Sequence, residues 1–163
     1  MDSNTSKPRP RNAGALAGVR ILDLTRALAG PFGSMILADL GAEVIKIEEP
    51  TARGQDLPRD NNITPMDLIM ERSGGGTVDT MSLCANRGKK SMVLDLKSQA
   101  GKAVFYDLAR TADIVLDNYR PDVPKRLGID YDTLRAINPR VICCSISGFG
   151  ATGPYSKRPA YDV

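Results

Sequence analysis

The chain has 163 residues, of which 42% are hydrophobic and 25% are charged, a composition typical of one soluble globular domain. Its 22 basic and 19 acidic residues leave a formal net charge of only +3, which is too small to imply nucleic-acid binding by bulk electrostatics. No apolar stretch approaches the roughly 20 residues that a membrane-spanning helix needs. We therefore expect neither a nucleic-acid partner nor a membrane partner.

Histidine is absent from the chain. This absence excludes a Ser-His-Asp or Cys-His catalytic set, His acid–base chemistry and a His-ligated metal site within these residues. The cysteines Cys84, Cys143 and Cys144 show neither a disulfide framework nor a zinc-binding spacing. We interpret the adjacent pair as small apolar side chains of a buried strand. A reducing compartment fits best, and we expect the cytoplasm, with a reducing organelle as the alternative.

The N-terminal residues 1–17 are rich in Pro, Asn, Ser and basic side chains and lack apolar periodicity, so we expect a disordered lead-in. Regular structure begins with a β-like run at 19–24 and a turn at 25–30. Pro31 then opens a helix with an expected apolar stripe of Met35, Ile36 and Leu40, and Gly41 closes it. A second strand at 43–48 completes a right-handed parallel crossover.

Residues 51–86 form the least regular third of the chain. Their prolines and glycines predict a long loop, with one helical turn around 67–72. The glycine run at 74–76 is not a phosphate-binding fingerprint, because no strand precedes it and no Lys-Ser/Thr follows.

The last part of the chain alternates strands and helices. We expect strands at 91–96, 114–116 and 141–146, and helices at 98–111, 123–127 and 131–137. The apolar face predicted for the helix at 98–111 consists of Ala100, Ala103, Val104 and Leu108. The final strand is a nearly continuous apolar run, typical of parallel strands buried on both faces. The alternation predicts an α/β fold with a doubly wound parallel sheet. Because no closing helix follows the final strand, we expect an N-terminal fragment of a larger domain.

A set of collinear motifs resembles one family. The blocks GVRILDLTRALAGP at 18–31 and LGAEVIKIE at 40–48 resemble the opening of the family III CoA-transferases, which include the α-methylacyl-CoA racemases. The resemblance continues through NRGKKS (86–91), LDLK (94–97), DNYRP (117–121), RLG (126–128), NPRVI (138–142), SGFGATGP (147–154) and RPAYD (158–162). It implies that 18–163 is the N-terminal part of a Rossmann-like large domain built from both ends of the family's chain. It also implies an inserted smaller domain and, for the full-length enzyme, an interlocked homodimer.

The resemblance further implies a CoA-binding site at the carboxyl ends of the strands. Its residues are Leu28 and Ala29, with Arg26 nearby, then Leu94, Asp95, Leu96, Lys97, Asn118, Tyr119, Arg120, Arg126, Tyr161 and Asp162. A turn before a helix is a natural anion site, and Lys and Arg side chains suit phosphates. The alternative is a plain turn with solvated surface cations. We interpret Lys89 and Lys90 as charges that flank a turn.

Glu49 departs from the family pattern, because the transferases often carry at this position an Arg that meets CoA. Either the loop takes another course or Arg53 substitutes for that Arg.

The family's transferases use an Asp nucleophile that forms a mixed anhydride with the donor acyl group. That Asp belongs beyond Asp162, so we expect no catalytic residue in this chain and no activity from it alone. The implied substrates are an acyl-CoA and a carboxylic acid, with coenzyme A as a substrate and neither a covalent cofactor nor a metal. One alternative is a 2-methylacyl-CoA racemase, disfavoured because Tyr161, with an ordinary pKa near ~10, replaces its His base. The other is a catalytically inactive CoA-binding module.

Overall fold

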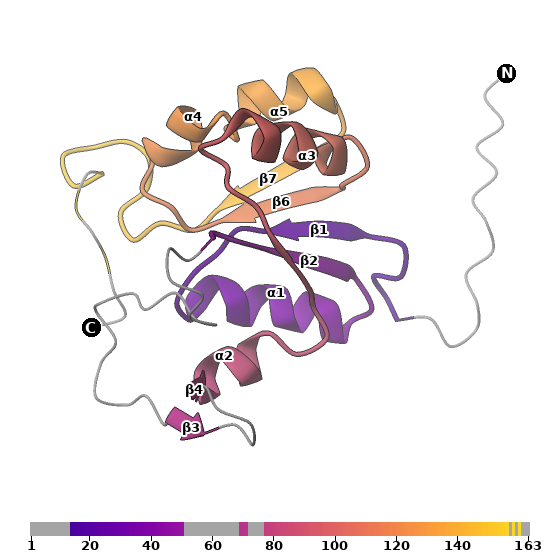
Figure 1. The fold of residues 1–163 in the computed structure, drawn as a ribbon. Helices are drawn as coiled ribbons and strands as arrows, with labels where there is room; N and C mark the ends of the chain where they lie inside the picture. Colours follow the sequence, from indigo (N-terminus) through magenta and orange to yellow (C-terminus); the bar gives the residue numbers. More distant parts are fainter. Residues whose placement is uncertain (1–13, 51–68, 72–76, 157, 159, 161–163) are drawn as a thin grey trace, which may run out of the picture.

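A computed structural model describes residues 14–50, 69–71, 77–156, 158 and 160 of the chain. Within them, five parallel strands form one sheet, shown in Figure 1. These strands are β1 (Arg20–Asp23), β2 (Glu43–Glu48), β5 (Lys90–Val93), β6 (Ile114–Asp117) and β7 (Ile142–Ser145). They stand in the order β5-β2-β1-β6-β7. Counted along the chain, this is the 3-2-1-4-5 order of a Rossmann-type sheet, and the predicted α/β fold is confirmed.

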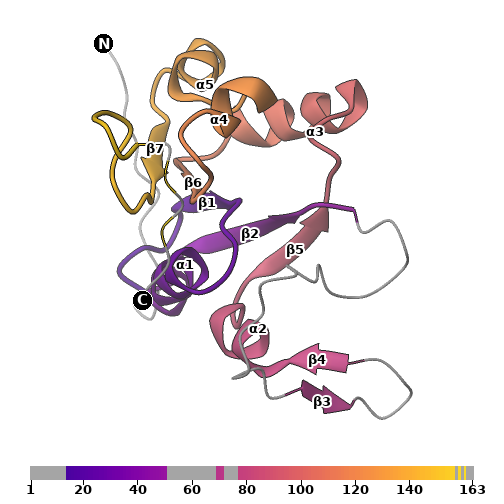
Figure 2. The same cartoon turned by 90° about the vertical axis from the view of Figure 1, so that its left-hand side faces the viewer.

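Helices cover both faces of the sheet (Figures 1 and 2). Helix α1 (Ala29–Asp39) lies on one face, and α3 (Gln99–Ala109), α4 (Val123–Leu127) and α5 (Tyr131–Ile137) lie on the other. The larger core joins Leu22 of β1 to the fully buried Phe105 of α3 and Leu134 of α5. In the smaller core, Ile21 of β1 and Leu116 of β6 pack on the α1 face of the sheet, where Leu37 of α1 contacts the cluster. The sheet is therefore doubly wound, as the alternation of elements predicted.

The helix ends follow local chemistry. The hydroxyl of Ser98 caps α3 by accepting a hydrogen bond from Gly101 N at 3.0 Å. The Asp130 carboxylate caps α5 in the same way, by accepting from Thr133 N. Helix α4 ends at Gly128, whose φ of 73° is the left-handed conformation that glycine adopts without strain.

The buried face of α1 differs from the predicted stripe. Met35 is buried, but Ile36 and Leu40 are 43% and 44% exposed. The buried face instead begins with Gly30 and continues with other small residues. A Cβ on Gly30 would lie only 2.3 Å from Cβ of Thr25. Close approach of the helix to the end of β1 therefore decides which residues face the sheet.

Helix α3 also has a different phase from the predicted one. Ala100, Ala103 and Val104 are exposed, and only Leu108 of the predicted face packs on the core. The buried residues are Gly101, Phe105 and Ala109. Gly101 is required where the helix meets the preceding turn, because an added Cβ would stand 2.0 Å from the Asp95 carbonyl oxygen. Burial of the large Phe105 ring fixes the rest of the face.

Strand β7 stands at the edge of the sheet, so its predicted burial on both faces is wrong. Ile142 is 59% exposed, Cys143 is half-buried and Cys144 is exposed. The interpretation of the cysteine pair as buried apolar side chains therefore fails for Cys144. An apolar run shows that a segment is a strand but does not show where that strand stands in the sheet.

The irregular third of the chain contains more regular structure than predicted. Strands β3 (Ile69–Glu71) and β4 (Thr77–Asp79) pair antiparallel, and α2 (Thr80–Ala85) follows. The helical turn predicted around 67–72 is wrong at 69–71, which form β3. Strand β3 precedes the glycine run at 74–76, so the premise that no strand precedes it is wrong; the run itself lies outside the described residues.

Residues 14–17, expected to belong to the lead-in, form a turn against the end of α1. Leu16 N donates to the Leu40 carbonyl at 2.9 Å. Residues 1–13 lie outside the described part of the chain. No helix among the described residues has both the length and the apolar character needed to cross a membrane.

Candidate ligand-binding site

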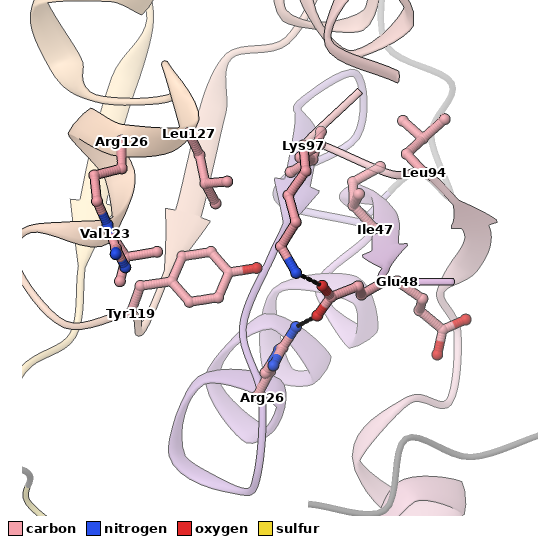
Figure 3. A pocket seen from close by; sticks show the side chains of 11 residues that line it. Arg26, Ile47, Glu48, Leu94, Lys97, Tyr119, Val123, Arg126 and Leu127 are labelled. Carbon is pink, nitrogen blue, oxygen red and sulfur yellow. Dashed lines mark hydrogen bonds and ion pairs between the residues drawn. The ribbon is translucent and has the colours of Figure 1, made fainter. Parts of the chain in front are cut away.

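A pocket of about 450 Å³ opens at the carboxyl ends of the strands (Figure 3). The segments that follow four neighbouring strands and the short helix α4 line it. Arg26 follows β1, Ile47 and Glu48 end β2, and Glu49 follows it. Leu94, Leu96 and Lys97 follow β5, and Tyr119 follows β6. Helix α4 contributes Val123, Arg126 and Leu127. Ligands of open α/β sheets bind at this edge, so the pocket occupies the expected position.

Aspartates shape three of the strand ends that form the pocket. The carboxylate of Asp23, at the end of β1, accepts from Thr25 N at 2.9 Å. Asp95 accepts from Lys97 N at 2.9 Å, and Asp117 accepts from Tyr119 N at 3.0 Å. Each is the side-chain-to-backbone turn that aspartate forms readily. The LDL and LDN motifs thus turn the chain where it enters the pocket.

Asn118 joins the turn after β1 to the end of β6. Arg26 N donates to Asn118 Oδ1 at 2.8 Å, and Asn118 Nδ2 donates to the Arg26 carbonyl at 2.7 Å. The next residue, Ala27, has a φ of 57°, a left-handed conformation that is uncommon outside glycine. The paired amide and backbone hydrogen bonds hold Arg26 at the rim of the pocket.

Tyr119 supplies the aromatic wall of the pocket. Its side chain is half-buried and packs against the larger core, and burial raises the pKa of its hydroxyl. The Arg26 guanidinium carbon lies 5.6 Å from the centre of the ring, within the range of a cation–π contact. An aromatic face beside a guanidinium suits a planar base next to a phosphate.

One carboxylate joins two of the pocket's cations. Glu49 Oε2 lies 2.5 Å from Arg26 Nη2, and Glu49 Oε1 lies 2.5 Å from Lys97 Nζ. Dashed lines from Arg26 and from Lys97 mark these two contacts in Figure 3. The hydrogen bonds from Lys97 and Arg26 lower the pKa of Glu49, and the hydrogen bond to Glu49 raises the pKa of Lys97. The third cation, Arg126, pairs with Asp122 at 3.4 Å within α4.

A buried charge cluster lies at the end of β1, on the α1 side of the sheet. Asp23 is fully buried, and its carboxylate accepts from Ser34 Oγ at 2.6 Å and from Thr25 Oγ1 at 2.5 Å. The Lys89 ammonium, on a side chain that is 1% exposed, lies 3.0 Å from Asp23 Oδ2. Lys89 also donates to Ser34 Oγ, the Pro31 carbonyl and Asn86 Oδ1 at 2.7, 2.9 and 3.2 Å.

The cluster contains one more cation than carboxylate. Lys46 Nζ lies 4.0 Å from Asp23 Oδ2 and donates to the Thr25 carbonyl. Burial lowers the pKa of both lysines. Burial alone would raise the pKa of Asp23, but Lys46 and the hydrogen bonds from Ser34 and Thr25 lower it overall. The interpretation of Lys89 as a turn-flanking charge is therefore wrong. An aspartate in an apolar strand indicates that buried polar partners accompany it, but it does not show that the partner is a cation: Asp117, at the end of β6, accepts from Ser145 Oγ instead.

The structure brings part of the predicted site together. The predicted residues that line the pocket are Leu94, Leu96, Lys97, Tyr119 and Arg126. Asp95 and Asn118 shape its walls through the hydrogen bonds above. Leu28, Ala29 and the exposed Arg120 do not line the pocket. Tyr161, Asp162 and Arg53 lie outside the described residues. The pocket is also lined by residues that the sequence did not predict, namely Ile47, Glu48, Val123 and Leu127. An apolar pattern along a strand does not show which side chain faces a cavity.

Among the described residues, no group of three or more acidic or cysteine side chains is placed to hold a metal ion.

The sheet order and the cation-lined pocket at its carboxyl edge define a Rossmann-type α/β protein with a site suited to an anionic ligand. The chain belongs to CoA-transferase family III, whose model matches residues 16–163.

Named relatives agree with this assignment. The chain is 41% identical over 153 residues to succinate–glutarate CoA-transferase of Agrobacterium fabrum, covering 94% of this chain and 37% of that protein. It is 42% identical to the human succinyl-CoA:glutarate CoA-transferase, covering 99% of this chain and 33% of that one. The chain thus spans about a third of the length of these curated relatives.

Solved structures share the fold. The crystal structure of Rv3272 from Mycobacterium tuberculosis matches with a TM-score of 0.77 and 39% identity, over 92% of this chain and 39% of that one. A CAIB/BAIF family protein from Brucella suis matches with a TM-score of 0.79 and 37% identity, over 92% of this chain and 38% of that chain.

Proposed function

We propose that this chain supplies the CoA-nucleotide site of a CoA-transferase. The enzyme would move CoA from an acyl-CoA donor to a carboxylic acid. The observation that carries the proposal is the pocket itself, in which Arg26, Lys97 and Arg126 stand around the Tyr119 ring at the ligand-binding edge of a Rossmann-type sheet. Relatives named as acetyl-CoA:oxalate and succinyl-CoA:glutarate CoA-transferases, at 43% and 42% identity, support the same reaction class.

In the proposed binding mode, the adenine ring packs against Tyr119 and the apolar wall of Leu94 and Leu96. The phosphates meet the cations, because ammonium and guanidinium groups form charge-assisted hydrogen bonds with phosphate oxygens. The thioester end of CoA leaves the pocket toward parts of the enzyme outside this chain.

The reaction itself needs a nucleophile that we place outside these 163 residues. Its Asp carboxylate attacks the donor thioester, which forms a mixed anhydride and releases CoA as a thiolate. The thiolate then attacks the aspartyl carbonyl of the anhydride, which frees the donor acid and leaves an aspartyl-CoA thioester. The acceptor carboxylate attacks the aspartyl-CoA thioester, which forms a second mixed anhydride and releases the CoA thiolate. The thiolate then attacks the acceptor acyl carbonyl of that anhydride, so that the acceptor leaves as its CoA ester and the Asp carboxylate is regenerated.

For the whole enzyme we further propose an interlocked homodimer in the cytoplasm, with acyl-CoA and a carboxylic acid as substrates and no covalent cofactor. These proposals rest on family membership. The Agrobacterium and human relatives are both named as transferases, which favours transfer over the racemase alternative.

The experiment is a calorimetric titration of the 163-residue chain with CoA, using two tyrosine variants. Tyr119→Leu removes the ring that faces Arg26, and Tyr131→Leu removes a ring on α5 that Arg135 contacts at 5.9 Å outside the pocket. Loss of base stacking should weaken binding roughly tenfold in Tyr119→Leu and hardly change it in Tyr131→Leu. No CoA binding by the wild type, or equal losses in both variants, would contradict the proposal.

A further inference from the structure

Glu49 lies between the two cations that a ligand phosphate needs. It follows the end of β2, whereas Arg26 follows β1 and Lys97 follows β5, so three chain segments meet at one carboxylate. Each of its carboxylate oxygens lies 2.5 Å from a different cation. A doubly hydrogen-bonded carboxylate at this point is a close stand-in for two oxygens of a phosphate group.

The charge balance of the pocket depends on this residue. The described lining residues include three cations, Arg26, Lys97 and Arg126, and two carboxylates, Glu48 and Glu49. Glu48 accepts from Ser91 Oγ, and no ion pair joins it to the described cations of the pocket. Among the described residues, Glu49 is therefore the carboxylate that pairs with both Arg26 and Lys97, and an anion that binds these two cations competes with it.

We propose that Glu49 is an internal counter-ion that competes with the ligand for Arg26 and Lys97 and so keeps simple carboxylates out of the phosphate position. The inference rests on the proposed function. A monocarboxylate would replace one carboxylate by another without any gain in charge, and it would compete with a group that the chain holds in place. A phosphate or pyrophosphate group brings more charge and more acceptor oxygens, so it can displace Glu49. An enzyme whose acceptor is a carboxylic acid gains from this selection at its nucleotide site.

The test compares Glu49→Gln with Glu43→Gln, a carboxylate at the start of β2 that also pairs with two cations, Arg20 and Lys90, but does not line the pocket. Both replacements keep the side-chain shape and remove one charge. Wild type and variants are titrated at low ionic strength with CoA and with inorganic pyrophosphate. Acetate is then added as a competitor of pyrophosphate. The ion pairs are partly exposed, so removal of the competing charge should tighten Glu49→Gln binding roughly three- to tenfold.

Glu43→Gln should change both affinities less than twofold, and acetate should compete with pyrophosphate in Glu49→Gln but not in the wild type. Unchanged or weaker pyrophosphate binding by Glu49→Gln would overturn the inference and make Glu49 a residue that positions the two cations. An equal gain in Glu43→Gln would overturn it too, since diffuse charge would then be at work. Tighter pyrophosphate binding without CoA binding in any protein would support the inference and reject the proposed function.

Discussion

The Lys89 ammonium lies 3.0 Å from Asp23 Oδ2, with both side chains almost entirely excluded from solvent. The Lys89 ammonium also donates hydrogen bonds to the Pro31 carbonyl and to Ser34 Oγ. Together these contacts join the start of β5 to β1 and to the N-terminal part of α1. The turn that carries Arg26 runs between these anchored points. The buried pair is thus a structural support of the pocket, although neither residue lines it.

Adjacent lysines provide a direct test of this support. Lys89→Met removes a cation from the buried carboxylate and should destabilise the fold by about 3 kcal/mol. Lys90→Met removes an exposed cation paired with Glu43 at 2.5 Å, and its effect should stay within about 0.5 kcal/mol. Urea denaturation measures both free energies of unfolding. Similar losses in the two variants would show that burial of Lys89 does not matter for stability.

The same residue should leave a signature in the pH dependence of stability. Burial lowers the pKa of Lys89 and of Lys46 in the folded state, below the ordinary value of 10.5. Between the folded and unfolded pKa values, the unfolded chain binds more protons, so the free energy of unfolding rises with pH in that window. Lys89→Met should show a smaller rise than the wild type, measured by urea denaturation at a series of alkaline pH values. An identical slope in both proteins would mean that the pKa of Lys89 is not lowered.

Two glycines in helices should respond in opposite directions to alanine. Gly101→Ala places a Cβ about 2.0 Å from the backbone oxygen of Asp95 and should destabilise the protein by about 1–3 kcal/mol. Gly33, inside α1, has open space around its added Cβ, so Gly33→Ala should stabilise by about 0.5–1 kcal/mol. Thermal unfolding monitored by circular dichroism measures both changes. A stabilising Gly101→Ala would show that the turn after β5 can move away from α3.

The sequence predicted the alternating fold well because local patterns specify it. Helix α1 begins at Ala29, two residues before the predicted start at Pro31, and Gly41 follows its end, so the local signals place the helix to within two residues. The apolar runs of β1 and β2 are intrinsic to those segments. It did not predict the phase of α3, which depends on the tertiary contact between Gly101 and the Asp95 carbonyl. The edge position of β7 likewise depends on sheet order, which a strand's own residues do not specify.

The candidate site was predictable only in part for a similar reason. Lys97, Tyr119 and Arg126 follow strand ends or lie in a short helix after one, so topology brings them to one edge. The roles of Lys89 and Glu49 depend on contacts with residues between 23 and 66 positions away in sequence. Neighbouring Lys89 and Lys90 are the same residue type, yet one is buried and the other exposed. Residue type alone does not distinguish them.

The isolated chain should not catalyse CoA transfer, since the proposed nucleophile lies outside it and removal of a covalent catalyst leaves only binding effects. Incubation with an acyl-CoA and isotopically labelled carboxylic acids, followed by chromatography, should show no label in the CoA ester above background. Boiled protein serves as the control. Label transfer that follows the protein through purification would place a nucleophile within these residues.

The pocket at the carboxyl edge of the sheet should bind the CoA nucleotide through specific cations. The most direct measurement is the calorimetric dissociation constant of CoA for Arg126→Ala, which lines the pocket, and Lys90→Ala, which does not. Loss of one charge-assisted contact at an exposed position should weaken CoA binding roughly three- to tenfold in Arg126→Ala. Binding by Lys90→Ala should stay within about twofold of the wild type, and added salt should weaken wild-type binding because exposed charges are screened. Equal losses in the two variants would contradict the account, because they would show that only diffuse positive charge attracts CoA.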